Sequence, residues 1–160
     1  MSSAQPLHAM ARGRGGNDDI VHWDGQQKSL HHVWDTRILA KLLQEKYAND
    51  ESNMILALEQ SISTLTSTYG RRVERWTACL DKPNASVLEC TLAWTTEANR
   101  VACSVALPLF DRDPSADLST AYYQSVRHGV EMILVKTAVR LAVVLERVLS
   151  KCAILPVVHE

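Results

Sequence analysis

Apolar residues recur at helical spacing along most of the chain, in four stretches where they return every three or four positions. The first stretch, "SLHHVWDTRILAKLLQEKYA", begins at Ser29, whose hydroxyl suits the N-cap of a helix. The other helical regions are predicted over residues 50–80 (interrupted near Gly70), 86–107 (ending near Pro108) and 120–153 (kinked at Gly129, with Asp117 or Ser119 as its cap). The pattern therefore predicts a mostly α-helical protein.

The first 28 residues follow a different pattern and carry four of the six glycines, namely Gly13, Gly15, Gly16 and Gly25. This composition predicts a loop-rich segment. Within it, "IVHW" is followed by Asp24-Gly25, a dipeptide typical of two-residue turns, which predicts a short hairpin. We therefore expect one domain over residues 1–160, with a glycine-rich loop over 1–28 and helices over 29–160.

The composition is that of an ordinary globular domain, with 46% hydrophobic and 22% charged residues. A net charge of −1 excludes a general electrostatic attraction to nucleic acid, so any such binding must be local. Charged residues interrupt the most apolar segment, 130–149, which argues against a membrane span: Glu131, Lys136, Arg140, Glu146 and Arg147. The first residues lack the apolar run of a signal peptide, and the localisation stays unassigned.

Four cysteines, Cys79, Cys90, Cys103 and Cys152, allow two disulfides in three connectivities, which the sequence leaves open. None of them lies in a CxxC pair, so a thiolate zinc site is not indicated. The sequon "NAS" makes Asn84 a glycosylation candidate if the chain is exported. These features favour export only weakly and assign no function.

The candidate chemistry is concentrated in "SLHHVWDT", residues 29–36. His31 and Asp35 are four residues apart, so on a helix they share one face and can reach one cation. A third ligand would come from His8 or His22 in the glycine-rich segment. Two histidines, a carboxylate and an open position are typical of a catalytic zinc. The simpler alternative is a solvated His–Asp pair of the kind common on helices.

Three motifs near the start of the chain carry a family resemblance: "QPLH" at residues 5–8, "GGN" at residues 15–17 and "SLHHVWD" at residues 29–35. They are similar to the "QPLH", "GGN" and "NLHxxWD" motifs of the zinc-dependent S1/P1 nuclease family. Further along, "WTTEANRVAC" and "EMILVKTAVRLAVVL" resemble later helices of that family. The resemblance covers nearly the whole chain and is most specific in its first third.

The resemblance implies a mostly helical, phospholipase C-like fold with three zinc ions at the base of a cleft. By position in the motifs, His8, His31 and Asp35 would be ligands of one zinc, which leaves His32 outside. The implied reaction is phosphoester hydrolysis, either cutting single-stranded nucleic acid or removing the 3′-phosphate of a nucleotide. Metal ions suit it because they lower the pKa of bound water and neutralise oxyanions. Family members are usually secreted or surface-exposed.

The departures from the family pattern concern the other two zincs. A zinc-bridging aspartate of the family falls at Ser2, and further ligands would precede this sequence. We therefore expect an incomplete, C-terminal copy that keeps one of three zinc sites, with no assigned catalytic residue and doubtful activity of its own. Ser29, Ile133 and Ala138 replace the asparagine, glutamine and glycine of the pattern. The alternatives are a catalytically inactive zinc-binding remnant and a metal-free helical interaction module.

Three further residues are candidates for nucleotide contacts. Trp23 could stack on a base, and Arg12 and Arg14 in "ARGRGG" could contact phosphate. A solvated loop explains the two arginines equally well. Trp34 and Trp94 lie on apolar helix faces and are expected in the core.

Overall fold

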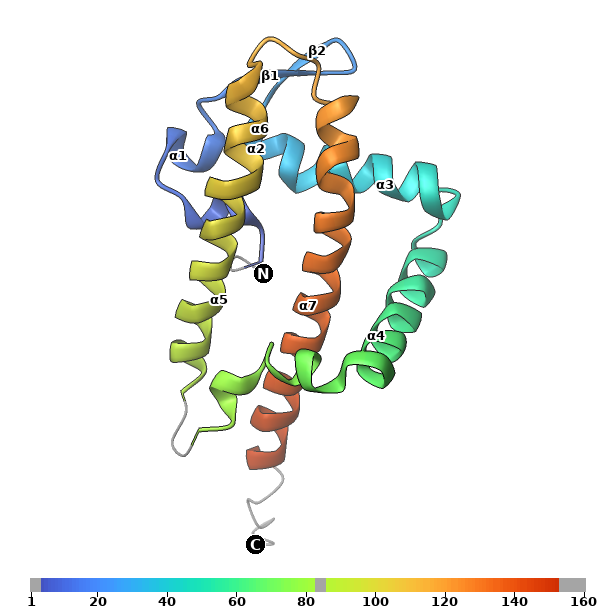
Figure 1. The fold of residues 1–160 in the computed structure, drawn as a ribbon, viewed down its shortest axis with the longest axis vertical. Helices are drawn as coiled ribbons and strands as arrows, with labels where there is room; N and C mark the ends of the chain where they lie inside the picture. Colours follow the sequence, from blue (N-terminus) through green and yellow to red (C-terminus); the bar gives the residue numbers. More distant parts are fainter. Residues whose placement is uncertain (1–3, 83–85, 153–160) are drawn as a thin grey trace, which may run out of the picture.

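The computed structural model describes residues 4–82 and 86–152, and its helices confirm the prediction of a mostly α-helical protein (Figure 1). In chain order the elements are η1 (Pro6–Ala9), α1 (Gly13–Gly16), β1 (Ile20–Trp23), β2 (Gln26–Ser29), α2 (Leu30–His32), η2 (Val33–Arg37), α3 (Ile38–Tyr47), α4 (Glu51–Glu74), η3 (Ala78–Leu80), α5 (Val87–Val101), η4 (Ala102–Ala106), α6 (Leu107–Arg112) and α7 (Ala121–Cys152). Helices α5 and α7 follow the long axis, α3 crosses near one end, and the hairpin covers that end (Figure 1). In the part of the chain described, no helix combines the length and apolar character needed to span a membrane.

The predicted hairpin is confirmed. Strands β1 and β2 pair antiparallel with Trp23 opposite Gln26, so Asp24 and Gly25 form the two-residue turn. Both turn residues have positive φ, 48° and 71°, as a type I′ turn requires. The Asp117 carboxylate accepts hydrogen bonds from the backbone N–H groups of Asp24 at 3.1 Å and Gly25 at 2.7 Å. Helix α7 begins at Ala121, so Asp117, one of the two residues predicted to cap it, fastens the hairpin turn instead.

Asp117→Asn is expected to destabilise the protein by about 1–2 kcal/mol at pH 7, because the turn N–H groups then bond to a neutral acceptor. Partial burial favours a raised pKa for Asp117, but hydrogen bonds from Ser119 and the turn N–H groups outweigh it and lower the pKa to about 2. A carboxyl group whose pKa is lower in the folded state than in the unfolded state stabilises the fold at pH values above its unfolded-state pKa, near 4. For Asp117 this stabilisation is lost as the pH falls towards 2. Urea unfolding between pH 7 and pH 2 measures the difference, which should shrink on acidification. Asp81→Asn, at an exposed position, is the control and should change little.

The first predicted helix contains a wider turn that the sequence pattern did not indicate. Ser29 is its N-cap, as predicted, and its hydroxyl accepts from the His32 N–H at 3.1 Å. After α2, the segment η2 (Val33–Arg37) is π-helical, and regular helix resumes in α3. Such π turns are uncommon and are frequent at functional sites. This one carries Asp35.

A second π-helical turn corrects the prediction that the helix starting near residue 86 ends near Pro108. Segment η4 separates α5 from α6, and Pro108 lies in the first turn of α6, which continues to Arg112. Pro108 has no N–H to donate, and it follows directly on the wider π-helical turn of η4. Helix α4 leaves helical geometry at Tyr69, which confirms the interruption near Gly70. Helix α7 runs through Gly129 without a break.

The core lies where the hairpin, η2, η4 and the start of α7 meet. Its members are buried apolar side chains from distant parts of the chain, among them Leu7, Val21, Leu30, Ile38, Phe110, Tyr123 and Val126. Trp34 is 5% exposed and donates to the Tyr122 hydroxyl at 2.7 Å, which confirms its core position. Trp94 is half-buried instead and donates to the Trp76 carbonyl. This packing fixes α2 beside α1, and η1 beside η4 and α5, where the candidate site forms.

Two other sequence features have clear outcomes. A disulfide joins Cys79 on η3 to Cys90 on α5, which is one of the pairings that the sequence left open. Cys103 is a free, exposed thiol. Asn84, the glycosylation candidate, lies outside the described residues.

Candidate metal centre

Three potential metal ligands from separate elements come together at one end of α2. His8 lies on η1, His31 on α2 and Asp35 on η2, and one ligand atom from each lies within 4.8 Å of the others. His31 Nε2 is 3.1 Å from Asp35 Oδ2, and His8 Nε2 is 3.3 Å from Asp35 Oδ1. Among the described residues, no other group of three histidine, cysteine or carboxylate side chains converges in this way.

The orientation of the His31 ring leaves its second nitrogen facing the carboxylate. His31 Nδ1 is 2.7 Å from the carbonyl oxygen of Gly15. A carbonyl can only accept, so Nδ1 carries the hydrogen and Nε2 of a neutral ring presents a lone pair to Asp35. A lone pair facing a carboxylate oxygen at 3.1 Å requires a cation or a proton between them. Histidine ligands of metals are usually held this way, by a hydrogen bond from the other ring nitrogen.

His8 is positioned by the short helix η1 and by stacking on His31. The two rings are nearly parallel, at 27°, with centroids 4.9 Å apart. Pro6 and Leu7 are buried, and Asn99 on α5 donates to the Ala9 carbonyl at 2.7 Å, so η1 is fixed at both ends. The motif "QPLH" thus supplies buried anchors as well as a candidate ligand.

Gln5 has a role that sequence reasoning missed. Its side-chain carbonyl accepts from the His8 N–H at 3.0 Å, and its amide donates to Asp35 Oδ1 at 2.9 Å. The amide therefore fixes the Asp35 carboxylate relative to His8, as carboxylate ligands are commonly held. The motif "QPLH" includes Gln5, and this was the one sequence signal for its role. The motif alone did not indicate the contact with Asp35.

Gly15 is the second contributor that was missed. Its φ is +72°, and a Cβ there would lie 2.9 Å from the Leu7 carbonyl oxygen and 3.4 Å from His31 Nδ1. A side chain at this position would strain the backbone and push on both η1 and the His31 ring. Only glycine allows the loop to approach the imidazole this closely.

Gly15→Ala is expected to lower metal affinity about 10-fold or more, because it displaces the carbonyl that orients His31. Gly25→Ala is a matched control, since Gly25 also has positive φ, +71°, but no atom lies within 4 Å of its added Cβ. Both variants should lose about 1 kcal/mol of stability from backbone strain, and only Gly15→Ala should weaken metal binding. Titration calorimetry with zinc separates the two; equal affinities would contradict the proposed orienting role.

The donor set fits a zinc ion. Nitrogen and oxygen ligands about 2 Å from a tetrahedral ion lie about 3.3 Å apart. Each imidazole Nε2 lies near this distance from the Asp35 carboxylate, with His8 facing Oδ1 and His31 facing Oδ2. The ligands are accessible, since the side chains of His8, His31 and Asp35 are 28%, 20% and 37% exposed. Neutral imidazoles and a carboxylate suit zinc, whereas calcium and magnesium prefer oxygen ligands alone. The site can therefore hold zinc with one position open to a ligand.

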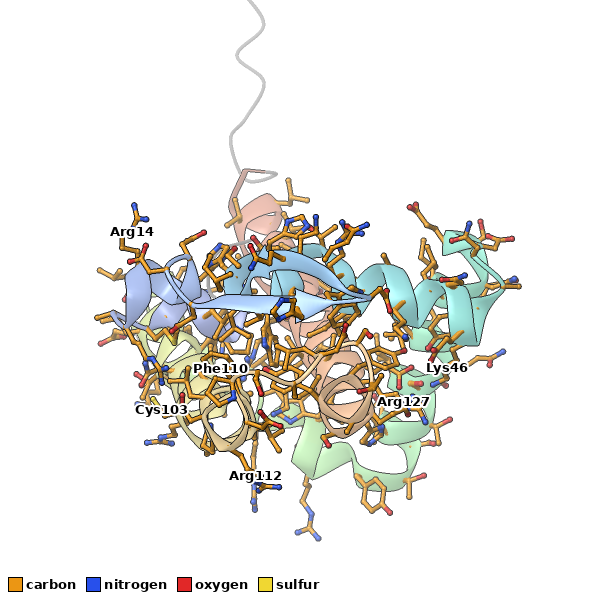
Figure 2. The ribbon with its side chains drawn as sticks, turned by 90° about the horizontal axis from the view of Figure 1, so that it is seen from above. Arg14, Lys46, Cys103, Phe110, Arg112 and Arg127 are labelled. Atoms are coloured by element: carbon orange, nitrogen blue, oxygen red, sulfur yellow. A yellow bond between two sulfur atoms is a disulfide. The ribbon has the colours of Figure 1, made fainter. Side chains whose placement is uncertain are left out.

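The two candidate arginines differ in their relation to this cluster. Arg14 lines a cavity of about 390 Å³ together with His8, Gly15 and His31. Its exposed guanidinium pairs with Asp18, which raises the pKa of Arg14 and lowers that of Asp18. Figure 2 shows Arg14 projecting outward at the edge of the molecule. The structure thus brings Arg14 to the cluster and leaves its guanidinium accessible.

Arg12, by contrast, is committed to other contacts. It pairs with Asp111 at 2.8 Å and Asp19 at 3.4 Å, and it lies over the Phe110 ring. The hydrogen bond with Asp111 raises the pKa of Arg12 and lowers that of Asp111. Arg12 therefore ties the glycine-rich loop to α6 and does not line the cavity beside the cluster.

The structure corrects the expectation for Trp23. Its side chain is 3% exposed and packs edge-on against Tyr123, with the Lys41 ammonium 6.0 Å from its ring centroid. At this exposure the ring offers a base almost no surface for stacking, so Trp23 is a core residue here. Side chains alternate between the two faces of β1, and Trp23 lies on the buried face with Val21.

His22, the other histidine considered as a third ligand, is not part of the ligand cluster. It lies on β1, where its carbonyl accepts from the Leu118 N–H. Of the two histidines considered, the structure brings His8 to the cluster.

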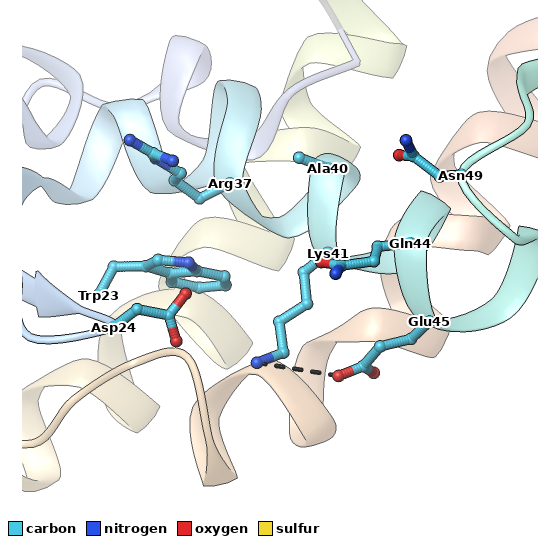
Figure 3. Close-up of a pocket in the computed structure, with 8 residues that line it drawn as sticks. All are labelled: Trp23, Asp24, Arg37, Ala40, Lys41, Gln44, Glu45 and Asn49. Atoms are coloured by element: carbon cyan, nitrogen blue, oxygen red, sulfur yellow. Dashed lines mark ion pairs between the residues drawn. The ribbon is translucent and has the colours of Figure 1, made fainter.

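A larger polar cavity of about 680 Å³ lies beside the hairpin turn, lined by Trp23, Asp24, Arg37, Ala40, Lys41, Gln44, Glu45 and Asn49 (Figure 3). Lys41 and Glu45, one turn apart on α3, pair at 3.8 Å along its wall. None of the three clustered ligands lines it. It is therefore a separate feature from the metal centre.

Comparisons with known proteins match nearly the whole chain. A family model described as S1/P1 Nuclease matches residues 3–150. Endonuclease 5 of Arabidopsis thaliana is 32% identical over 147 residues, which cover 91% of this chain and 47% of that protein. Nuclease S1 of Aspergillus oryzae is 30% identical, covering 92% and 50%, and Nuclease P1 of Penicillium citrinum is 31% identical, covering 86% and 50%. The chain spans about half the length of the curated relatives it matches.

Proposed function

The chain belongs to the S1/P1 nuclease family, and we propose that His8, His31 and Asp35 hold a zinc ion as one metal site of a nuclease active centre. The observation that carries this proposal is the convergence of two imidazole Nε2 atoms on one carboxylate, with His31 fixed through Gly15. A zinc ion bound there would act as a Lewis acid on a phosphate oxygen or a water molecule. The family relationship supports a nuclease at the level of the whole enzyme.

The substrate we propose is single-stranded nucleic acid or a 3′-nucleotide, bound by its phosphate in the open cavity beside the cluster. His8 and His31 line that cavity, and Arg14 supplies a positive charge at its rim. A phosphate entering there would compete with Asp18 for the guanidinium, which suits arginine because its planar fork binds two oxygens at once. Gln5 would keep Asp35 oriented while substrate binds.

A second function is favoured by the number of ligand clusters. The described residues bring together one such group, whereas catalysis by paired metals needs ligands for two ions about 3.5–4 Å apart. The relatives are about twice as long as this chain. The alternative is therefore a zinc-binding chain with no hydrolytic activity of its own, in which zinc fastens η1 and the glycine-rich loop to η2.

Metal analysis with an activity assay tests both functions. After zinc loading and gel filtration, we expect about one zinc per chain and a higher melting temperature that chelator reverses. The same sample is assayed on single-stranded DNA, RNA and a 3′-nucleotide. Chelator-sensitive hydrolysis supports the enzyme, and one bound zinc without turnover supports the alternative. Absence of bound zinc would contradict both and favour a helical interaction module.

A further inference from the structure

His8, one of the three candidate ligands, lies on a very short element. Helix η1 is a 3₁₀ helix of four residues, Pro6–Ala9. So short a helix leaves most of its backbone groups without partners of its own, and its position depends on contacts with neighbouring elements. The His8 side chain is 28% exposed, so burial of the ring does not fix it either. The position of this ligand is therefore set by the groups that hold η1.

Helix η1 packs against α5 and η4. Small side chains allow a close approach, since Ala98 and Ala102 are 6% and 0% exposed and Leu7 of η1 shares one buried cluster with Ala102. Burial of apolar surface is a non-directional attraction. It keeps η1 on this surface but does not by itself fix how far η1 slides or turns against the alanines. A directional contact is needed for that.

Asn99 on α5 supplies the directional contact. Its side-chain amide donates to the Ala9 carbonyl at 2.7 Å, across 90 positions of the sequence. A carbonyl can only accept, so Nδ2 faces Ala9, and Oδ1 is left to accept a weak bond from the Cys103 thiol at 3.9 Å. Ala9 directly follows His8 and ends η1, where carbonyl groups have no partner within the helix. The bond therefore fixes the end of η1 that is adjacent to the ligand.

Two side-chain amides thus hold η1 at its two ends. At the first end, Gln5 bonds to the His8 N–H and to the Asp35 carboxylate. Gln5 directly precedes η1 in the chain, so it links the candidate ligands to one another but not to the long helices. Asn99 lies on α5, which begins with a capping box and is joined to η3 by the disulfide. Asn99 is therefore the amide that links His8 to the helical framework.

We propose that Asn99 is a positioning residue of the metal centre, which holds η1 so that His8 Nε2 stays beside the Asp35 carboxylate. This inference rests on the proposed function, because it assigns Asn99 a part in zinc binding. Asn99 is not one of the clustered side chains and acts through His8. Without its hydrogen bond, η1 can shift along α5, and the 3.3 Å between His8 Nε2 and Asp35 Oδ1 is no longer maintained. Groups that only orient a ligand typically contribute about 10–100-fold to metal affinity.

Asn99→Asp tests the proposal, because it keeps the shape of the side chain and replaces the donor with a carboxylate oxygen that can only accept. Zinc affinity, measured by titration calorimetry, should fall about 10-fold or more. The visible absorption bands of the cobalt(II)-loaded protein report coordination geometry and should also change. A loss of general stability alone would not alter these bands.

Asn53→Asp is the matched control for this substitution. The Asn53 amide on α4 also donates to a backbone carbonyl, that of Tyr47 at 3.4 Å, and it lies outside the ligand cluster. Zinc affinity of this variant should therefore stay within about twofold of the wild type.

Measurements without metal separate this inference from the proposed function. The His8 and His31 rings stack with centroids 4.9 Å apart, so the NOE between their ring protons reports the position of His8 when no zinc is bound. Asn99→Asp should weaken this NOE, and Asn53→Asp should not. Loss of the NOE in Asn99→Asp alone supports the inference even if the wild type binds no zinc and the proposed function fails.

Retention of the NOE in Asn99→Asp would overturn the inference, whether or not the wild type binds zinc. If the wild type does bind zinc, an unchanged affinity in Asn99→Asp, or an equal loss in both variants, would also overturn it. If Asn99→Asp does not fold, Asn99→Ala replaces it in each measurement, since it too removes the donor.

Discussion

His31→Ala is expected to abolish zinc binding by this chain, with at least a 100-fold loss of affinity. The substitution removes one of three ligands and also the ring on which His8 stacks. Removing a group that only orients a ligand already lowers metal affinity about 10–100-fold, so removing the ligand itself should lower the affinity more. Zinc at 100 times its dissociation constant stabilises a folded protein by about 2.7 kcal/mol, and this gain should vanish in the variant. Calorimetric titration and thermal unfolding with zinc measure both effects.

His32→Ala is the matched control for that experiment. His32 is adjacent in sequence, is also half-buried and lies outside the ligand cluster. Its backbone N–H, which bonds to Ser29, is retained in the variant. Zinc affinity should therefore stay within about twofold of the wild type. Loss of zinc in His32→Ala, or retention of zinc in His31→Ala, would contradict the assignment of the ligands.

The features that the sequence predicted correctly depend on short-range rules. Asp24-Gly25 specifies a two-residue turn through the positive φ that both residues adopt, and Ser29 caps the helix through its own hydroxyl. The i, i+4 spacing of His31 and Asp35 placed both side chains on one face. These rules need no knowledge of the tertiary fold. The resemblance supplied His8, 23 positions away, and the structure brings it to the same place.

The features that were missed depend on packing between distant segments. The Gly15 carbonyl reaches His31 only because the loop folds back beside Leu7, and no local pattern encodes that approach. The ion pair with Asp111, 99 residues away in the sequence, holds the Arg12 guanidinium against α6 and away from the cluster. Trp23 is buried by Tyr123 on α7, which a strand pattern alone cannot place. Spacing in the sequence therefore identified the candidate ligands. The orientation of His31, and the positions of Arg12 and Trp23 away from the cluster, depend on contacts between distant segments.

The candidate ligand cluster is built directly on the core, because Asp35 follows Trp34 on the π-helical turn. Trp34 is 5% exposed, and its indole N–H donates to the Tyr122 hydroxyl. That hydroxyl is 3.3 Å from the Ala106 carbonyl and donates to it, which links η2 through α7 to η4. Burial raises the pKa of Tyr122, so the hydroxyl stays protonated and can donate throughout the physiological range. The position of Asp35 thus depends on a buried chain of hydrogen bonds.

Trp34→Ala is expected to destabilise the protein by about 3–5 kcal/mol, through a large cavity and a Tyr122 hydroxyl left without its donor. Trp34→Phe keeps most of the apolar packing and should cost less, about 1–2 kcal/mol. Tyr69→Ala is the control, because Tyr69 is 52% exposed and its truncation should cost under about 1 kcal/mol. Urea unfolding without metal measures all three, and saturating zinc should recover part of the loss in Trp34→Ala because zinc binds only the folded state. A loss in Trp34→Ala no larger than in Tyr69→Ala would show that the core beneath the metal centre is not formed as described.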